Sequence, residues 1–489
     1  MRAAPVPLEP DAATLRAWLD ACGALALDAA RGDAAAPACG ALGGAALDIA
    51  DEVSRPIAEE PLAGGVDEAL RLVRRAAEAG LVPGGPGYLA YVPGSGLFAS
   101  ALADLVAANL NRFTGLTAAS PALCRLEGDV LAWLAAECGY GSDARGVLLS
   151  GGSLANLGGV LTAREARFGD AGDLRRATAY TSAQAHHCVD KALRLAGLRT
   201  ANVRRVPVDA AFRLDADALR RAVAADRGAG LEPFLVVASA GTTNTGAVDP
   251  LPDVAAIARE HGLWLHVDAA YGGAFVLCDE GRRRLAGLAE ADSLALDPHK
   301  GLFLPFGTGC LLVRDGRALR AAHSAHAGYL QDFDALERGR EAPSPTEYGP
   351  ELSRSYRGLR LWLPLMLHGA RAFRAALAEK LALAARFHDG LCRRIDAGAA
   401  LEVVAEPQLS TTAFRPARRA GESLDAWNTR GRALLAAVNA RGRVHLSSTA
   451  LPVADGDAFT LRVCVLGMRT HAEQVDACLA DLDAALGSA

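Results

Sequence analysis

The feature that most constrains the fold is a regular alternation of short apolar runs and helical segments between residues 145 and 315. The runs include "GVLLS", "ATAYTS", "PFLVVASA", "LWLHVDAA" and "SLALD". Most are followed by a polar or glycine-rich turn and then by a helical pattern. This alternation predicts an α/β fold with a mostly parallel sheet covered on both faces. In such sheets, ligands bind beyond the carboxyl ends of the strands, so polar residues just after the runs are candidates for a site.

The remaining chain divides into two further parts. Residues 11–80 are alanine-rich and helical in pattern, and residues 82–96 form a Gly/Pro-rich loop. After about residue 365, long Ala/Leu helices alternate with a few strands. We therefore predict an N-terminal helical segment (1–80), a large α/β domain (81–365) and a smaller C-terminal α+β domain (366–489). The charged stretch 332–353, which contains Pro and Gly, is predicted to be a long mobile loop of the kind that forms lids.

Composition excludes several classes of function. About half of the 489 residues are apolar, and the net charge of −5 comes from mixed acids and bases, which does not indicate nucleic-acid binding. The ten cysteines are scattered without CxxC pairs, which predicts no metal site and buried thiols in a reducing compartment. The first 20 residues lack a signal-peptide pattern, and no apolar run reaches about 18 residues. We expect a soluble, cytoplasmic protein with no membrane contact.

Four polar features follow the apolar runs. The turn "SGGSLANL" places Gly152 and Ser153 before a helix, where backbone N–H groups can bind an anion; a tight turn with a serine cap is the alternative. His186, in "QAHHC", stands at the start of a helix. It could be a helix cap, a surface residue or a ring that stacks on a flat cofactor. Asp268 follows a strongly apolar strand and needs a partner, either a nearby cation or the ring nitrogen of a cofactor.

The fourth feature is Lys300, in the apolar stretch "SLALDPHKGLFLPFGTGCLLV". It lies 300 − 268 = 32 residues after Asp268, about one strand–helix–strand unit, so two successive strand ends would present a carboxylate and an amine to one cleft. The lysine could reach solvent through its flexible stem, or it could form a Schiff base. A phosphate cradle, a stacking ring, a carboxylate and an aldehyde-binding lysine together predict a pyridoxal 5'-phosphate site.

The chain resembles the group II pyridoxal-phosphate-dependent amino-acid decarboxylases, which act on substrates such as aromatic amino acids, glutamate and 2,4-diaminobutyrate. The resemblance spans roughly residues 80 to 480. It is carried by "HVDAAYGG", "ADSLALDPHKG", "SGGSLANL", "QAHHCVDKA", "AGTTNTGAVDP", "AASPALCRLEGDVLAWL", "LSRSYRGLRLWLPLMLHG" and "LRVCVLGMRTH". It implies the fold-type I, aspartate-aminotransferase-like architecture. It also implies a homodimer with a shared active site and N-terminal helices that wrap around the partner.

The resemblance also implies roles for individual residues. Lys300 corresponds to the Schiff-base lysine, Asp268 to the carboxylate that pairs with the pyridinium nitrogen, and His186 to the ring-stacking histidine. Ala270 corresponds to the small residue packed on the ring, and Thr242 to a threonine near the ring hydroxyl and the substrate. The implied phosphate contacts are Gly152, Ser153 and His299.

The implied reaction is decarboxylation of an L-amino acid to the amine and CO₂. In related enzymes a tyrosine on the mobile loop returns the proton to the substrate carbon, crossing to the partner's site. Here Tyr348 is the candidate, although its spacing differs, and it could equally be a loop aromatic without a chemical role. His186 is the other candidate donor. The alternative reaction is decarboxylation coupled to oxidative deamination, which gives an aldehyde. Outside this class, the alternative is a non-enzymatic nucleotide-binding protein, which would leave Lys300 and Asp268 unexplained.

Several positions depart from the aromatic-amino-acid decarboxylases. Gly301 stands where those enzymes have a tryptophan, and Gly94 where they have a threonine near the substrate carboxylate. Asp297 stands where some relatives have asparagine. Because these changes remove bulk and contacts, the sequence does not assign an aromatic substrate. Arg354 and Arg357 could meet an acidic substrate or lie on a helix surface.

Overall fold

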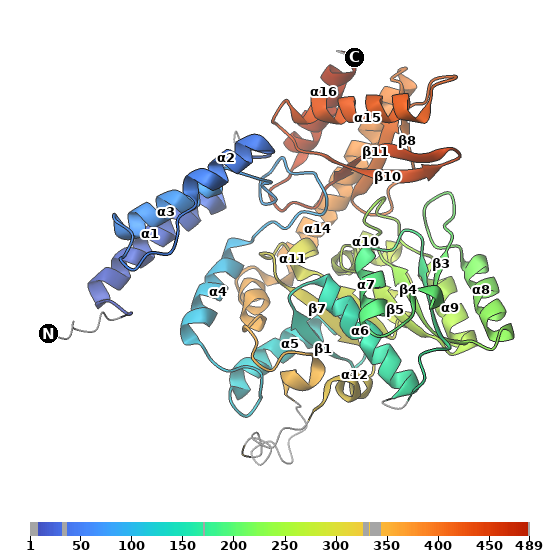
Figure 1. The fold of residues 1–489 in the computed structure, drawn as a ribbon, viewed down its shortest axis with the longest axis horizontal. Helices are drawn as coiled ribbons and strands as arrows, with labels where there is room; N and C mark the ends of the chain where they lie inside the picture. The colour runs from blue at the N-terminus through green and yellow to red at the C-terminus, as the bar shows by residue number, and fades with distance from the viewer. Residues whose placement is uncertain (1–7, 32–36, 170–171, 326–331, 333–343, 488–489) are drawn as a thin grey trace.

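A computed structural model describes residues 8–31, 37–169, 172–325, 332 and 344–487 (Figure 1). Its centre is a seven-stranded sheet of order β1-β7-β6-β5-β4-β2-β3. The pairs from β6 through β5, β4 and β2 to β3 are parallel, whereas β7 runs antiparallel to both β6 and β1. The predicted mostly parallel sheet is therefore confirmed, with one reversed strand. The strands are β1 (Arg145–Leu149), β2 (Ala177–Ser182), β3 (Val203–Val206), β4 (Glu232–Ser239), β5 (Trp264–Asp268), β6 (Ser293–Leu296) and β7 (Gly309–Val313).

Helices connect these strands and cover the sheet. Every residue of β2, β6 and β7 is buried, as expected for strands with helices on both faces. The helices of this part of the chain are α4 (Phe98–Leu110), α5 (Pro121–Glu137), α6 (Gly152–Phe168), α7 (His187–Leu195), α8 (Ala216–Gly228), α9 (Leu251–His261), α10 (Asp279–Arg284), α11 (Pro298–Gly301) and α12 (Gly316–His323). Short 3₁₀ turns lie at η1 (Thr200–Asn202), η2 (Gly273–Leu277), η3 (Leu288–Glu290) and η5 (Pro345–Tyr348).

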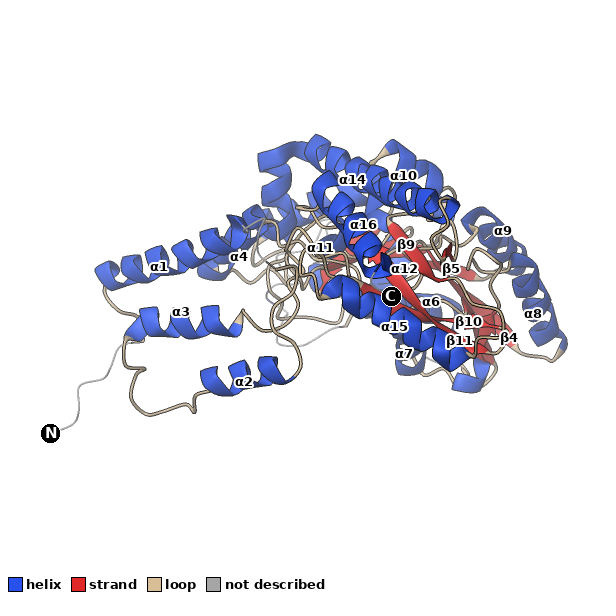
Figure 2. Cartoon of the chain, turned by 90° about the horizontal axis from the view of Figure 1, so that it is seen from above, coloured by secondary structure: helices blue, strands red, loops and turns tan. Residues whose placement is uncertain are grey.

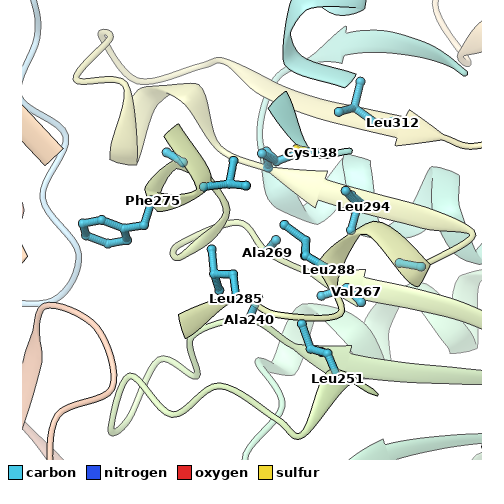
Figure 3. Packing of buried hydrophobic residues seen from close by; sticks show 14 of the residues in the cluster. Cys138, Ala240, Leu251, Val267, Ala269, Phe275, Leu285, Leu288, Leu294 and Leu312 are labelled. Atoms are coloured by element: carbon cyan, nitrogen blue, oxygen red, sulfur yellow. The ribbon is translucent and has the colours of Figure 1, made fainter. Parts of the chain in front are cut away.

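The largest apolar core lies around this sheet. Figure 3 shows part of it, where Leu285 and Leu288 lie near Val267 and Leu294 of the sheet. Burial of these side chains removes their apolar surface from water, at about 25 cal/mol per Å².

A second, smaller core belongs to a four-stranded antiparallel sheet of order β10-β11-β9-β8. This C-terminal α+β part, predicted from the sequence, lies above the large sheet in Figure 1. Its elements are β8 (Leu401–Val403), β9 (Thr411–Pro416), α15 (Leu424–Asn439), β10 (Ser447–Val453), β11 (Gly456–Cys464) and α16 (Ala472–Gly487).

The helix α14 (Gly358–Asp396) joins the two parts. Its first half, up to Leu381, packs into the core of the large sheet, and the segment from Leu383 packs into the smaller core. The helical path is interrupted at Gly369, which has a left-handed backbone (φ 69°) that glycine adopts readily. The boundary predicted between residues 365 and 366 thus falls inside a helix that both cores share.

The N-terminal helices α1 (Ala12–Arg31), α2 (Gly44–Val53) and α3 (Gly65–Ala76) project away from the rest of the chain (Figures 1 and 2). We call residues 12–76 the N-terminal arm. Neither α1 nor α3 contains a buried residue, and α2 buries only Ile49. The arm therefore has almost no core of its own.

Among the described residues, no helix combines the length and apolar character needed to cross a membrane. The same residues contain no group of three or more His, Cys, Asp or Glu side chains arranged to hold a metal. Six of the ten cysteines are buried, and Cys22 is exposed on α1, which corrects the expectation of buried thiols at that position.

Candidate active site

The site is a cavity of about 300 Å³ at the carboxyl ends of the large-sheet strands. All eight residues predicted to contact a cofactor line it. They are Gly152, Ser153, His186, Thr242, Asp268, Ala270, His299 and Lys300. The alternation of strands and helices therefore brings together residues that span about 150 positions of sequence, as expected for an α/β sheet.

The N-terminus of α6 forms one wall. The N–H groups of Gly152 and Ser153, in the first turn, have no carbonyl four residues earlier to bind, and the helix dipole adds a partial positive charge there. A Cβ atom on Gly152 would lie 2.9 Å from Asp297 Oδ2 and 3.0 Å from the Ala270 Cβ, so only glycine fits. This wall has the donors and the close backbone approach that a phosphate group requires.

His299 and Thr242 flank this wall at other strand ends. The His299 Nδ1–H donates to the Thr308 carbonyl at 2.8 Å, which leaves Nε2 to face Asp297 at 3.8 Å. Burial lowers the pKa of His299. The Thr242 hydroxyl oxygen accepts from the Ala247 N–H at 3.1 Å and lies 3.0 Å from the Thr245 hydroxyl, so its position is set by the turn that it closes.

Asp268 is the last residue of β5, and its side chain reaches the cavity. It is 8 % exposed, and its Oδ1 accepts from the backbone N–H of Ala270 at 3.2 Å. A buried carboxylate with a single neutral donor is a strong partner for a cation placed in the cavity. Ala270, two residues later, presents only a methyl group, which leaves room for a flat ring.

His186 caps the N-terminus of α7. Its Nδ1 accepts from the backbone N–H of Cys188 at 3.3 Å, so the ring proton is on Nε2. Burial lowers the pKa of His186, while the Asp268 charge opposes the shift. The ring is thus neutral, and it lies 4.1 Å from that of His187, centre to centre. A neutral ring on the cavity wall can stack on a flat cofactor.

Lys300 lies in α11, the single turn that follows β6. Its Nζ is 2.9 Å from Asp297 Oδ2. Burial disfavours the ammonium, but the nearby Asp297 and Asp268 charges outweigh it, and the pKa of Lys300 is raised. The amine of this partly buried lysine is therefore held in the cavity by ion pairing rather than extended to solvent.

Sequence reasoning missed several lining residues. Asn156 and Cys188 line the cavity, and the Asn156 amide donates to the Cys188 sulfur at 3.4 Å. Behind them, His266 Nε2 lies 2.8 Å from Asn156 Oδ1, and His266 Nδ1 lies 2.7 Å from the Ser293 hydroxyl. Burial lowers the pKa of His266 to about 4. The apolar strand "LWLHVD" signalled burial at this position, but it did not signal which side chain His266 would meet.

Tyr348 is the one predicted catalytic residue that the structure does not bring into the cavity. It is buried in η5, in an apolar cluster with Val147, Leu149 and Leu319. Its hydroxyl is directed to Arg145 at the start of β1. The Pro345 turn folds the segment back onto β1 and α12, so Tyr348 does not enter the cavity of its own chain, and its role as a donor to a partner's site stays a prediction. Residues 333–343 of the predicted lid lie outside the described residues.

Three further residues considered from the sequence for the substrate pocket contact other parts of the chain. Gly301 faces Ala274, since a Cβ on Gly301 would lie 2.3 Å from the Ala274 Cβ, so this position does not open the cavity. Arg354 forms a buried ion pair with Glu127 at 2.6 Å, and Arg357 pairs with Glu351 at 2.7 Å. These arginines are neither surface residues nor part of the cavity lining.

A lysine and a carboxylate on neighbouring strand ends, beside an anion-binding helix terminus, define the class of lysine-dependent pyridoxal phosphate enzymes with an aminotransferase-like fold. Comparison with known sequences gives the family. The pyridoxal-dependent decarboxylase conserved domain matches residues 73–417, more than half of the chain, and the chain belongs to this family. It is a carboxy-lyase that uses pyridoxal 5'-phosphate and decarboxylates an amino acid. The family assignment removes the nucleotide-binding alternative.

Individual relatives and solved structures belong to the same family of enzymes. The chain is 34 % identical to an aromatic-L-amino-acid decarboxylase of Bacillus atrophaeus over 390 residues, which cover 80 % of this chain and 79 % of the relative. It is 32 % identical to a phenylacetaldehyde synthase of Petunia hybrida over 350 residues, covering 69 % and 67 % of the two chains. Among solved structures, Oryza sativa TDC with PLP and tryptamine has a TM-score of 0.88 and 27 % identity, with 99 % of each chain covered.

The residues present fit the cofactor, because the cradle, the flat space above Ala270, the carboxylate and the lysine match its phosphate, ring, ring nitrogen and aldehyde in turn. When bound, pyridoxal phosphate supplies a sink for the electrons left when CO₂ departs. The chain's own residues would hold the phosphate at α6, place a negative charge at Asp268 and present the amine of Lys300.

Proposed function

We propose that this chain decarboxylates an aromatic L-amino acid to the corresponding arylalkylamine. The observation that carries the proposal is the cavity in which Lys300, Asp268 and His186 converge beside the α6 terminus. The relative from Bacillus atrophaeus, which acts on aromatic amino acids by its name, supports the substrate class. So does the tryptamine bound to the Oryza sativa protein.

The residues around the cavity support an aromatic substrate in two further ways. The Phe306 ring is 58 % exposed and lies 5.5 Å, centre to centre, from the His299 ring, so it offers a flat apolar surface beside the cavity. It also covers Gly94, where a Cβ would lie 2.8 Å from the ring, and thus replaces the bulk that the glycine lacks. Arg354 and Arg357, the cations considered for an acidic side chain, are occupied by glutamates.

The roles of the site residues belong to the same proposal. Lys300 bonds the cofactor, Asp268 pairs with its ring nitrogen, and His186 stacks on its ring. Gly152, Ser153 and His299 contact its phosphate, while Thr242 and Ala270 border its ring. With Tyr348 buried elsewhere, the Nε2–H of His186 is the nearest of the predicted donors to the cavity.

A substrate panel tests the proposal. Protein loaded with pyridoxal phosphate is assayed with L-tryptophan, L-tyrosine, L-phenylalanine, L-glutamate and L-2,4-diaminobutyrate, and CO₂, amine, aldehyde and peroxide are measured. We expect an aromatic substrate to be preferred in kcat/KM by about tenfold or more, with amine and CO₂ in equal amounts. A preference for glutamate or diaminobutyrate would contradict the substrate class. Aldehyde and peroxide in equal amounts, in place of amine, would contradict the simple decarboxylation and favour the oxidative alternative.

We further propose a homodimer with a shared active site. Large apolar side chains are exposed on α1 and α4, including Trp18, Leu105 and Leu110, and Met366 and Leu367 extend this surface on α14. An arm without a core of its own and a broad exposed apolar surface suit a second copy of the chain. A cytoplasmic location is proposed as well, supported by a sequence whose scattered cysteines include six buried thiols.

A further inference from the structure

Asp297 is a second carboxylate at the lysine, besides Asp268. It follows β6 directly and lies one helical turn before Lys300, so the short helix α11 brings the two side chains together. Its side chain is only 3 % exposed, and its Oδ2 is 2.9 Å from Lys300 Nζ. The same oxygen faces the Gly152 backbone of the phosphate cradle.

The two oxygens of Asp297 have different surroundings. Oδ1 is buried and has no hydrogen-bond partner. The titratable groups that face the Lys300–Asp297 pair from surrounding elements are Asp268, His186, Cys188, His299 and Cys310. Burial lowers the pKa of both histidines and raises that of both thiols, so these four groups are uncharged. Among these neighbours, Lys300 is the cation that balances Asp297.

A buried ion pair of this kind changes when one partner loses its charge. A carboxylate and an ammonium in a water-poor site stabilise each other, so removing one charge leaves the other uncompensated. Lys300 must lose a proton before its amine can attack an aldehyde carbon, since the ammonium has no free electron pair. The adjacent carboxylate is placed to accept that proton.

We propose that Asp297 is a positioning residue and proton acceptor, which holds Lys300 as the ammonium in the cofactor-free site and takes its proton when the lysine bonds the cofactor. One Nζ–H proton of the ammonium passes to Asp297 Oδ2, and the neutral amine adds to the aldehyde carbon. The aldehyde oxygen then leaves as water with the two hydrogens that remained on Nζ, as the C=N bond forms. The proposal rests on the cofactor of the family and not on the aromatic substrate proposed above.

The test measures the lysine directly, without turnover. Cofactor-free protein is mixed with pyridoxal, which lacks the phosphate, and the rate of C=N formation is followed by absorbance from about pH 6 to pH 10. The adduct on Lys300 is trapped by borohydride and located by mass spectrometry. Asp297→Asn keeps the size of the side chain and removes its charge. Burial then lowers the pKa of Lys300 with one opposing charge fewer. We expect the pH midpoint of the rate to fall by about one unit or more.

Asp292→Asn is the matched control. Asp292 precedes β6 at its opposite end and accepts from the Leu265 N–H at 2.8 Å, far along the strand from the lysine. This variant should keep the wild-type midpoint. If Asp297→Asn does not fold, Asp297→Ser, which is smaller and also neutral, carries the same expectation. A lower amplitude with an unchanged midpoint would mean that Asp297 has only a structural role, and this result would overturn the proposal. So would an upward shift.

Discussion

Lys300 sits in an apolar segment because its charge has two carboxylate partners. Asp297 is in contact with the ammonium, and Asp268 contributes a second negative charge from the neighbouring strand. Lysine is rarely buried without such partners. The arrangement gives the amine a defined position in the cavity, which a lysine extended to solvent would lack.

The negative charge of Asp268 is expected to be essential for the reaction. Asp268→Asn keeps the shape of the side chain but removes the charge that favours a protonated ring nitrogen, so we expect kcat to fall about 100-fold or more. Lys300 is unchanged, so the cofactor should still be bound covalently, as its absorbance would report. Asp292→Asn serves again as a carboxylate control and should retain most of the activity. A kcat within about twofold of wild type in Asp268→Asn would exclude the proposed pairing.

Residue-scale inference from sequence succeeded where strand ends dictate position and failed where side-chain direction matters. Asp268 and Lys300 could be placed in one cleft because parallel strands end at one edge of the sheet. Gly301 could not be placed correctly, since the single turn of α11 points it at Ala274 and away from the cavity. The contact between Asp297 and Lys300 depends on the same turn.

At the scale of elements, the site depends on how closely α6 approaches the sheet. Gly159 in α6 packs directly against the His266 ring of β5, and a Cβ on Gly159 would lie 2.4 Å from a ring carbon. Through Asn156, the same contact region positions one wall of the cavity. Both the stability of the sheet and the geometry of the site therefore depend on the close packing of α6 against β5.

Gly159→Ala tests this close packing. The added methyl group must displace the buried His266 ring, so we expect a loss of about 1–3 kcal/mol in the free energy of unfolding, measured by urea denaturation. Gly128→Ala in α5 is the matched control, because a Cβ there meets nothing within 4 Å. In a helix this control should be neutral or stabilising, by up to about 1 kcal/mol. Equal stability changes in the two variants would show that α6 does not depend on this glycine.

The order of elements was predictable, but two of their arrangements were not. The period of apolar runs and helices predicted the sheet, because each buried parallel strand reads as a short apolar run. The reversal of β7 and the folding of Tyr348 against β1 depend on the path of the chain between elements, which the pattern of residues does not encode. The shared helix α14 likewise conceals the boundary between the two cores.

At the scale of the whole molecule, the exposed apolar surface of α4 needs a partner. Leu105 and Leu110 are each nearly half exposed on a helix whose opposite side packs on α14 and the chain core. The N-terminal arm projects beside this surface (Figure 2). We expect the double variant Leu105→Glu, Leu110→Glu to shift the protein from dimer to monomer in size-exclusion chromatography with light scattering, with loss of activity.

Leu195→Glu is the control for this experiment. Leu195 ends α7 and is 60 % exposed, so it has a similar surface area on a different part of the chain. It should remain dimeric and active. A double variant that stays dimeric, or a wild-type protein that is monomeric at micromolar concentration, would contradict the proposed interface.

The central claim, that Lys300 holds the cofactor in the cavity between Asp268 and α6, has one direct measurement. Purified protein incubated with pyridoxal phosphate is reduced with borohydride, digested and examined by mass spectrometry, alongside Lys300→Ala. We predict that the reduced cofactor is attached to the peptide containing Lys300. The Lys300→Ala variant should carry no label and should lack the absorbance band of the lysine-bound cofactor near the edge of the visible range. Label on a different lysine, or an unchanged absorbance band in Lys300→Ala, would contradict the account.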